Sequence, residues 1–295
     1  MHYDLTTGAV ASDLHKRSPV IAATPAATKC PVESSPSGLR ALLFDMDGTL
    51  AETESLAHRV AYNLTFQEMG LDIEWTPELY RELLRAPGGG RERVAHFRRL
   101  HQPDLGPDSN SDPLEWARRV HAGKSRHFRR LLREGCLPLR SGVRRLFFDA
   151  VSAGIRVCIV TNATRQTVAP VLRYALGERL EHCVEFVVGA ENVQRKKPHP
   201  DSYLLALDKL RLRAGDCVAV EDSASGLKAA VAAGLITVVV QNDDTEGEDF
   251  SAAALVVDSL GEPGKPSPRV LRGRLADTCV TIDSLRRLLA DSDGR

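Results

Sequence analysis

The sequence predicts an α/β fold, in which a parallel sheet is interrupted after its first strand by a long helical segment. Short, continuously apolar runs end abruptly in polar or charged residues, as strands covered on both faces of a parallel sheet do. Beyond Gly142 such runs alternate with helix-like segments, which is typical of parallel strands joined by right-handed crossovers. Before that glycine, apolar residues recur every three to four positions, which indicates helices.

The individual elements follow from these two patterns. Continuously apolar runs predict strands at residues 41–44, 155–160, 185–188, 217–221 and 236–240. Helices are predicted at residues 54–69, 77–85, 91–101, 113–134, 223–233 and 284–290. The stretch GEPGKPSPR at 261–269 predicts a loop.

The most informative motif is DMDGT at residues 45–49, directly after the first apolar run. Two carboxylates at the end of a central strand are costly unless something cationic holds them. A divalent cation is therefore the natural partner of Asp45 and Asp47. The alternative is a strand end capped by solvated aspartates, which is common for one aspartate and uncommon for such a pair.

Three later segments place reactive side chains where they could meet this pair. Thr161 and Asn162 follow a predicted strand, and Lys197 directly precedes a proline. Glu221 and Asp222 stand at the end of a further predicted strand. In an open α/β sheet, functional groups gather at the carboxyl ends of the strands, so these side chains are expected to converge on one crevice.

Each of these residues also has an ordinary structural explanation. Thr161 could cap the N-terminus of the next helix, and Lys197 could be solvated surface like its neighbour. Glu221 and Asp222 could stabilise the N-terminus of the following helix through its dipole, a role that is compatible with metal binding. Any one motif alone is weak, but the four in this order form a specific pattern.

Together the motifs resemble those of the haloacid dehalogenase (HAD) superfamily of phosphohydrolases. The resemblance covers about residues 40–258 and consists of DxDGT at 45–49, threonine at 161, lysine before proline at 197 and the acidic pair at 221–222. It implies a Rossmann-like three-layer core with a parallel sheet and an inserted helical cap that closes on substrate and excludes water. The implied bounds are 39–51 and 141–295 for the core and 52–140 for the cap.

The resemblance also implies how the motifs hydrolyse a phosphate ester. Asp45 is the expected nucleophile, which forms an aspartyl-phosphate, and Asp47 the expected general acid and base. Thr161 is expected to offer its hydroxyl and a backbone N–H to the phosphoryl oxygens, whose charge Lys197 neutralises. Mg²⁺ is the implied cofactor, and its expected ligands are Asp45, Asp47 through its main-chain carbonyl, Asp222 and the nearby Glu221.

Two segments of the helical region carry further signals. Glu54 and His58 lie four residues apart on one predicted helix near the nucleophile; the alternative is an exposed helical pair of small energetic value. The run Gly88-Gly89-Gly90 precedes a helix and offers backbone N–H groups and a positive dipole end, to which Arg91 and Arg93 add charge. A flexible turn between helices is the alternative there. The run is not a P-loop.

These two segments resemble the CbbY branch of the superfamily, in particular its plant and algal members. The shared residues are ETE with the following histidine and the run LYRELL…GGGRER. Members of this branch dephosphorylate xylulose 1,5-bisphosphate, an inhibitor of the carbon-fixing carboxylase, so the resemblance implies this phosphorylated sugar as substrate. It would place the distal phosphate at Gly89, Gly90 and Arg91 or Arg93, and the sugar hydroxyls at Glu54, His58 and Asn162.

Three other functions are compatible with parts of the pattern. A mutase like β-phosphoglucomutase shares the aspartate chemistry but returns the phosphoryl group to sugar. A phosphoglycolate-type phosphatase is a further option, which the basic run after the glycines disfavours. A receiver-like phospho-switch also combines strand-end aspartates with threonine and lysine, but it has no use for a lid or for the second acid of DxDGT.

Composition argues against several classes of partner. The 39 basic residues balance 39 acidic ones, so charge gives no indication of nucleic-acid binding. No apolar run is long enough to span a membrane, and no heptad pattern calls for an oligomer, so a monomer is expected. The six cysteines are scattered without a C-x-x-C pair, which fits a reducing compartment and argues against zinc.

Residues 1–38 differ from the rest of the chain. They are rich in Ala, Thr, Ser and Pro and lack periodicity, which predicts a disordered extension. They could instead be the remainder of an organelle transit peptide, although Asp4, Asp13 and Glu33 argue against it. The plastid stroma is the location that the resemblance favours, and the cytoplasm is the alternative.

Overall fold

One mixed sheet forms the core of this protein, whose computed structural model describes residues 38–85, 89–102, 113–135 and 137–293. Within these residues seven strands pair in the order β3-β2-β1-β4-β5-β6-β7. Neighbours from β3 to β6 are parallel, and β7 is antiparallel to β6. The strands are β1 Ala41–Phe44, β2 Arg156–Val160, β3 Val184–Val188, β4 Cys217–Glu221, β5 Ile236–Val240, β6 Leu255–Val257 and β7 Val270–Arg272. The predicted α/β fold is confirmed, whereas the predicted N-terminal extension lies outside the described residues except for its last position.

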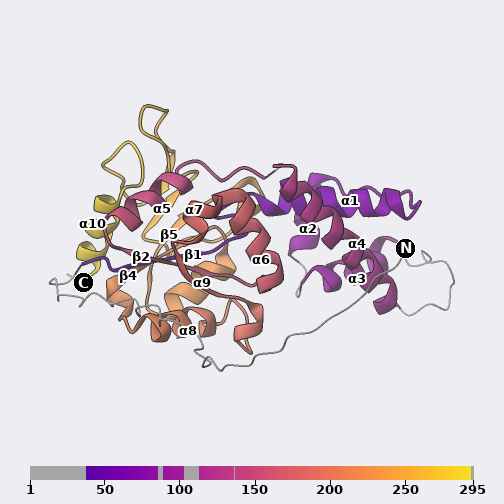
Figure 1. Cartoon of the computed structure of the whole chain (residues 1–295), viewed down its shortest axis with the longest axis horizontal. Helices are drawn as coiled ribbons and strands as arrows, with labels where there is room; N and C mark the ends of the chain where they lie inside the picture. Colours follow the sequence, from indigo (N-terminus) through magenta and orange to yellow (C-terminus); the bar gives the residue numbers. More distant parts are fainter. Residues whose placement is uncertain (1–37, 86–88, 103–112, 136, 294–295) are drawn as a thin grey trace, which may run out of the picture. The chain divides into compact units, whose positions relative to one another are not determined.

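Helices cover both faces of this sheet. Leu42 and Phe44 of β1 pack into one apolar cluster, and Ala41 and Leu43 pack into another, because successive strand residues face opposite ways. The two clusters make the core three-layered, as expected (Figure 1). The first is completed by α5 Val143–Ser152, α6 Arg165–Val171 and α10 Ile282–Asp293, and the second by α8 Asp201–Leu210 and α9 Ala224–Ala232.

The strands β6 and β7 were not predicted, although the loop between them was. Each is three residues long, which is too short to show a period in the sequence. β6 is buried, but every residue of β7 is exposed, so the edge of the sheet carries no apolar pattern either. A short π turn at Leu172–Leu176 and helix α7 at Glu178–Glu181 also escaped prediction.

A second group of helices follows β1 in the chain, where the sequence predicts them. They comprise a π turn at Glu54–His58, α1 Arg59–Glu68, α2 Pro77–Leu84, α3 Gly90–His101 and α4 Pro113–Arg133. Buried aromatic rings give these helices a core of their own; the ring centroids of Tyr62 and Trp75 lie 4.5 Å apart. A separate core is what an inserted domain needs in order to fold. The exact bounds of this cap stay predictions. In the described part of the chain, no helix is long and apolar enough to cross a bilayer.

Two adjacent linkers join the cap helices to the core. Ala51 pairs antiparallel with Leu139, and the N–H of Arg140 donates to the carbonyl of Leu50 over 2.9 Å. The chain therefore leaves and re-enters the core at one place, beside the loop that follows β1.

Candidate active site

The predicted strand-end residues meet at the carboxyl ends of β1, β2 and β4. The ammonium of Lys197 is at their centre and donates to Asp45 Oδ1 over 2.7 Å, to Glu221 Oε1 over 2.6 Å and to the carbonyl of Val160 over 2.7 Å. Thr161, the residue after Val160, is buried at the same place. The structure thus brings these segments together at the carboxyl edge of the sheet.

Lys197 is held rigidly and stays charged. Burial would lower its pKa, but the neighbouring carboxylates of Asp45 and Glu221 outweigh burial and raise it. Its backbone is held by Asn162, whose Oδ1 accepts from the Lys197 N–H over 3.0 Å and whose Nδ2 donates to the Lys197 carbonyl over 3.2 Å. One donor and one acceptor position of the Asn162 amide, expected to contact sugar hydroxyls, are therefore engaged with the lysine.

Thr161 differs in one detail from its expected role. Its backbone N–H donates to the carbonyl of Val188 over 2.9 Å, as part of the sheet, so this group is not free for a phosphoryl oxygen. Its hydroxyl accepts from the N–H of Ala163 over 3.0 Å, which leaves the hydroxyl hydrogen for another acceptor. Thr161 does not cap helix α6, whose N-cap is Thr164.

Three buried carboxylates form a cluster beside Lys197. One ligand atom each of Asp45, Glu221 and Asp222 can be chosen so that all lie within 4.8 Å of one another. Burial and the charge of Glu221 raise the pKa of Asp222 to about 8; burial also raises the pKa of Asp45, although Lys197 opposes this. Such repulsion among buried acids is what a hard divalent cation relieves, so the donor set fits Mg²⁺.

Within this cluster Glu221 has a different environment from the two aspartates. It is fully buried, and its Oε1 accepts from both Lys197 and the hydroxyl of Tyr203, the latter over 2.5 Å. Gly226 packs so closely that a Cβ there would lie 1.9 Å from Glu221 Oε2. Glu221 is therefore tied to the lysine and to Tyr203, whereas Asp45 shares only its Oδ1 with the lysine.

Asp222 is oriented by residues that the sequence prediction missed. The amide of Asn242 donates to Asp222 Oδ2 over 2.9 Å, and the hydroxyl of Thr49 donates to Oδ1 over 3.3 Å. A Cβ on Gly48, which has a φ of +81°, would lie 2.1 Å from Asp222 Oδ2. Asn242 follows the end of β5, so the strand-end rule that found the other residues could have identified it.

Asp47 is oriented by the first cap linker. The hydroxyl of Thr53 donates to Asp47 Oδ1 over 2.6 Å, and Nε2 of His58 lies 3.8 Å from the same oxygen. Burial and the nearby Lys124 lower the pKa of His58, which favours a neutral imidazole. The structure therefore brings the predicted His58 to the second aspartate of the motif and adds Thr53.

Glu54 lies in a partly buried network inside the cap. The hydroxyl of Tyr80 donates to Glu54 Oε2 over 2.5 Å, and NH1 of Arg93 donates to the Tyr80 hydroxyl over 2.9 Å and lies 3.5 Å from Glu54. Burial raises the pKa of Glu54, but Arg93, His58, the Tyr80 hydroxyl and Lys124 together outweigh it and lower the pKa to about 2. Glu54 is thus ionised and paired.

The two predicted arginines are separated by the structure. Arg93 belongs to the partly buried network, and its Nε has no hydrogen-bond partner among the described residues. Arg91 is exposed and lines a hollow of about 480 Å³ between α3 and α4, together with Arg99 and Arg118. Only Arg93 shares a network with Glu54.

The glycine run is only partly described. Gly88 lies outside the described residues, and the N–H of Gly89 donates to the side chain of Glu92 over 2.9 Å as a helix cap. Gly90 has a steric role, because a Cβ there would lie 2.6 Å from the hydroxyl of Tyr62. One of the N–H groups expected to bind an anion is thus already satisfied.

Lys124 of α4 is a cap residue that the sequence prediction missed. Its side chain is buried, and its ammonium lies 5.5 Å from the ring centroid of Tyr62 and 5.1 Å from that of Phe128. Burial lowers the pKa of Lys124 to about 8, while Glu54 opposes this change. Among the described residues, no acceptor forms a hydrogen bond with the ammonium. Helix α4 contains many basic residues, and nothing in the sequence distinguishes Lys124 from the others as the buried one.

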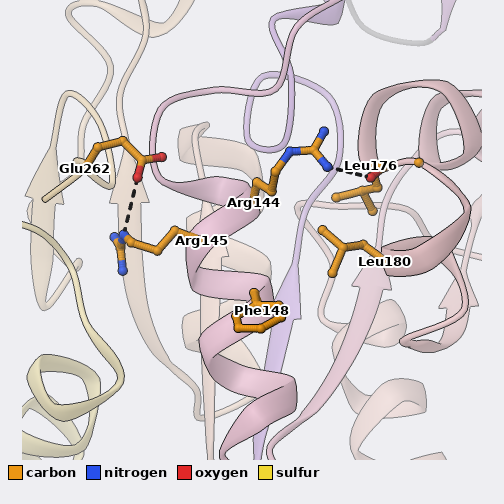
Figure 2. A pocket seen from close by; sticks show the side chains of 7 residues that line it. Arg144, Arg145, Phe148, Leu176, Leu180 and Glu262 are labelled. Carbon is orange, nitrogen blue, oxygen red and sulfur yellow. Dashed lines mark hydrogen bonds and ion pairs between the residues drawn. The ribbon is translucent and has the colours of Figure 1, made fainter.

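A separate hollow of about 550 Å³ lies beside α5. Figure 2 shows Arg144 directed toward Leu176 and Arg145 toward Glu262, with Phe148 below both arginines and Leu180 beside Leu176. None of its lining residues belongs to the acidic cluster or to the cap network. The chemistry is therefore assigned to the strand ends and not to this hollow.

The chain is similar to a known family of hydrolases and to several of its members. Residues 39–234 match a family model described as haloacid dehalogenase-like hydrolase. Protein CbbY from a plasmid of Cupriavidus necator is 40% identical over 235 residues, which cover 80% of this chain and 91% of that protein. The CBBY-like protein of Arabidopsis thaliana is 37% identical over 236 residues, which cover 79% and 73%.

A solved structure gives the same result in three dimensions. The crystal structure of an aspartate-to-asparagine variant of CbbY from Rhodobacter sphaeroides, in complex with xylulose 1,5-bisphosphate, matches with a TM-score of 0.66 and 38% identity. The match covers 77% of this chain and 96% of that one.

Proposed function

The chain belongs to the haloacid dehalogenase-like hydrolases, and on that premise we propose that it is a Mg²⁺-dependent phosphatase of xylulose 1,5-bisphosphate that works through an aspartyl-phosphate. Phosphatase activity itself follows from this membership. The observation that carries the proposal is the placement of Lys197 between Asp45 and Glu221, because it puts a fixed positive charge beside a carboxylate that must approach a dianion.

The residues divide the reaction into two displacements. In the first, a carboxylate oxygen of Asp45 attacks phosphorus and the ester P–O bond breaks, while Asp47 gives a proton to the departing sugar oxygen. In the second, Asp47 takes a proton from a water molecule while the water oxygen attacks phosphorus. The bond between phosphorus and the Asp45 oxygen breaks, and inorganic phosphate is released. Thr53 supports both steps by holding the Asp47 carboxylate.

Mg²⁺ would be held by Asp45 and Asp222, with the main-chain carbonyl of Asp47, and would neutralise charge on the transferring phosphoryl group. Glu221 then serves mainly to orient Lys197, since its carboxylate already accepts from that ammonium and from Tyr203. Thr49 and Asn242 each donate to one oxygen of Asp222 and thereby fix the orientation of its carboxylate.

The proposal of a bisphosphate rests on two cations inside the cap. Arg93 is paired with Glu54 but has a buried Nε without a hydrogen-bond partner among the described residues. Lys124 has a buried ammonium that lies against two aromatic rings and forms no close ion pair within the described part of the chain. A buried donor without an acceptor is costly, so a second phosphate is a fitting ligand for this region. The CbbY structure that contains xylulose 1,5-bisphosphate supports the same substrate.

Phosphate release from a panel of sugar monophosphates and bisphosphates, with and without Mg²⁺, tests the proposal; Asp45→Asn serves as the blank. Xylulose 1,5-bisphosphate is expected to give the highest kcat/KM, and a chelator to abolish turnover. A comparable kcat/KM for simple monophosphates would overturn the substrate. Accumulation of an isomeric sugar phosphate without phosphate release would instead identify a mutase.

The role of the cap cations is tested separately. Arg93→Ala and Lys124→Met are expected to raise KM for the bisphosphate far more than KM for a small monophosphate, whereas Arg91→Ala is the exposed control. Equal effects on the two substrates would remove the cap cations from substrate binding.

A location in the plastid stroma is the corresponding cellular proposal. The plant CBBY-like relative and the Ala-, Ser- and Thr-rich composition of residues 1–38 support it. A fluorescent fusion of the full chain should accumulate in plastids, and a fusion without residues 1–38 should not. Cytoplasmic fluorescence of the full-length fusion would favour the alternative.

A further inference from the structure

Two arginines five positions apart each donate to several main-chain carbonyls, but they hold different parts of the core. The guanidinium of Arg140 donates from NH1 to the carbonyls of Gly48 and Val240, each over 2.6 Å. Its NH2 donates to the carbonyls of Gln241 over 2.7 Å and Asp258 over 2.9 Å. One side chain therefore joins the loops that follow β1, β5 and β6.

Arg145 binds a segment far from the acidic cluster. Its NH2 donates to the carbonyls of Leu260, Gly261 and Val280 over 3.1, 3.0 and 2.8 Å. Arg145 also pairs with Asp149 and lies near Glu262 (Figure 2). It stabilises the chain between β6 and α10.

Arg140 has no comparable acidic partner. Among the described residues its closest carboxylate is that of Glu52, 3.8 Å from Nε and beyond hydrogen-bond distance. The side chain is nonetheless buried, so its hydrogen bonds go to main-chain carbonyls, while Asp222 and Glu52 act on its charge from longer range. Burying a cation in this way costs free energy, which only the contacts that Arg140 forms can offset.

The carbonyl of Gly48 connects Arg140 with the acidic cluster. It accepts from Arg140 and also from Nδ2 of Asn242 over 3.3 Å, and the same Nδ2 donates to Asp222 Oδ2. Gly48 directly follows Asp47, the expected general acid and base. A continuous set of hydrogen bonds thus runs from Arg140 through Gly48 and Asn242 to Asp222.

Arg140 also marks where the second cap linker joins the core. Its own N–H donates to the carbonyl of Leu50, and its neighbour Leu139 pairs with Ala51. The linker is therefore anchored by the main chain and the side chain of one residue, at the loop that bears the aspartates.

We propose that Arg140 is a positioning residue for phosphoryl transfer, which holds the loop after β1 against the loops after β5 and β6 so that Asp47 and Asp222 keep their places. The inference rests on the phosphatase chemistry described above and not on the identity of the sugar. It assigns Arg140 no contact with substrate.

The test compares Arg140→Lys with Arg145→Lys, because both replacements keep the charge and lose the fork that spans several carbonyls. The substrate is 4-nitrophenyl phosphate, which has no second phosphate, and kcat, KM, the Mg²⁺ concentration for half-maximal rate and Tm are measured below the lower Tm. Arg140→Lys is expected to lower kcat about 100-fold with little change in KM, and to raise the Mg²⁺ requirement. Arg145→Lys is expected to lower Tm and to leave kcat and the Mg²⁺ requirement unchanged.

Equal kcat values for Arg140→Lys and the wild type would overturn the proposal, and so would an equal fall in kcat for both variants. If Arg140→Lys does not fold, Asn242→Ala breaks the same set of hydrogen bonds from the other side. That variant is expected to raise the Mg²⁺ requirement and lower kcat, and a wild-type requirement would again contradict the proposal. Hydrolysis of 4-nitrophenyl phosphate without hydrolysis of xylulose 1,5-bisphosphate would remove the proposed substrate but leave this comparison valid.

Discussion

The ammonium of Lys197 lies 2.7 Å from the carboxylate of Asp45, and this ion pair is almost completely buried. The same ammonium satisfies Glu221, so one cation serves two acids. Removing it would leave two carboxylates with no compensating charge and would restore the repulsion between Asp45 and an incoming phosphate dianion.

Lys197→Met is accordingly expected to lower kcat about 1,000-fold or more, since its charge acts where charge accumulates in the transition state. Phosphate release under saturating Mg²⁺ measures the effect. Lys196→Met is the matched control, because its side chain is exposed one position away. A loss of less than tenfold in Lys197→Met would mean that another cation screens the nucleophile.

Tyr203→Phe tests the hydrogen bond from Tyr203 to Glu221, the carboxylate that orients Lys197. The change removes the hydroxyl that donates to Glu221 and leaves the ring in place, so the free energy of unfolding should fall by about 1–2 kcal/mol. A modest fall in kcat should accompany it, because Glu221 orients Lys197. Denaturant unfolding and turnover check the two effects. Tyr174→Phe, which alters an exposed ring, should change neither.

The sequence could predict the residues at strand ends because their positions follow from chain topology. Asp45, Thr161 and Glu221 each close an apolar run, and parallel strands bring such ends to one edge. Lys197 could be identified only from the proline that follows it and from the family resemblance. The same topological argument applies to Asn242, which follows the end of β5, so this residue could also have been predicted from the sequence.

Residues that act across helices could not be predicted in the same way. Lys124 is one of many basic residues on α4, and only the packing of that helix against α1 brings its ammonium over Tyr62. Arg91 and Arg93 are two positions apart, so the sequence could not say which one faces inward; helix rotation decides it. Such placements depend on packing, which no local pattern encodes.

Gly48→Ala is expected to abolish Mg²⁺-dependent turnover. The new methyl group would meet Asp222 Oδ2 at 2.1 Å, in a backbone with positive φ, so the carboxylate would have to move. Gly247→Ala is the control for backbone strain alone, since its φ is +82° but nothing lies within 4 Å of the added methyl group. That control should lose about 1–2 kcal/mol of stability and keep its activity. Metal titration monitored by turnover distinguishes the two, and an unaltered Mg²⁺ requirement in Gly48→Ala would contradict the assignment of Asp222.

The pH dependence of bisphosphate hydrolysis should follow the charge of Lys124. Because burial lowers its pKa from 10.5 to about 8, the ammonium loses its proton as pH rises through about 8. Glu54, Arg93 and Asp47 also act on this group, but none forms a close pair with it. The kcat/KM for xylulose 1,5-bisphosphate should therefore decline above pH 8 more steeply than that for 4-nitrophenyl phosphate, and Lys124→Met should remove the difference.

Stability should change in the opposite direction over the same range. Between pH 8 and 10.5 the unfolded chain binds a proton at Lys124 that the folded chain does not, so the free energy of unfolding contributed by this residue rises with pH. The full difference between the two pKa values corresponds to about 3 kcal/mol, which is absent in Lys124→Met. Denaturant unfolding of the wild type and the variant at pH 7.5 and pH 10 measures the contribution. Parallel pH profiles for the two proteins would show that the ammonium is solvated rather than buried against Tyr62 and Phe128.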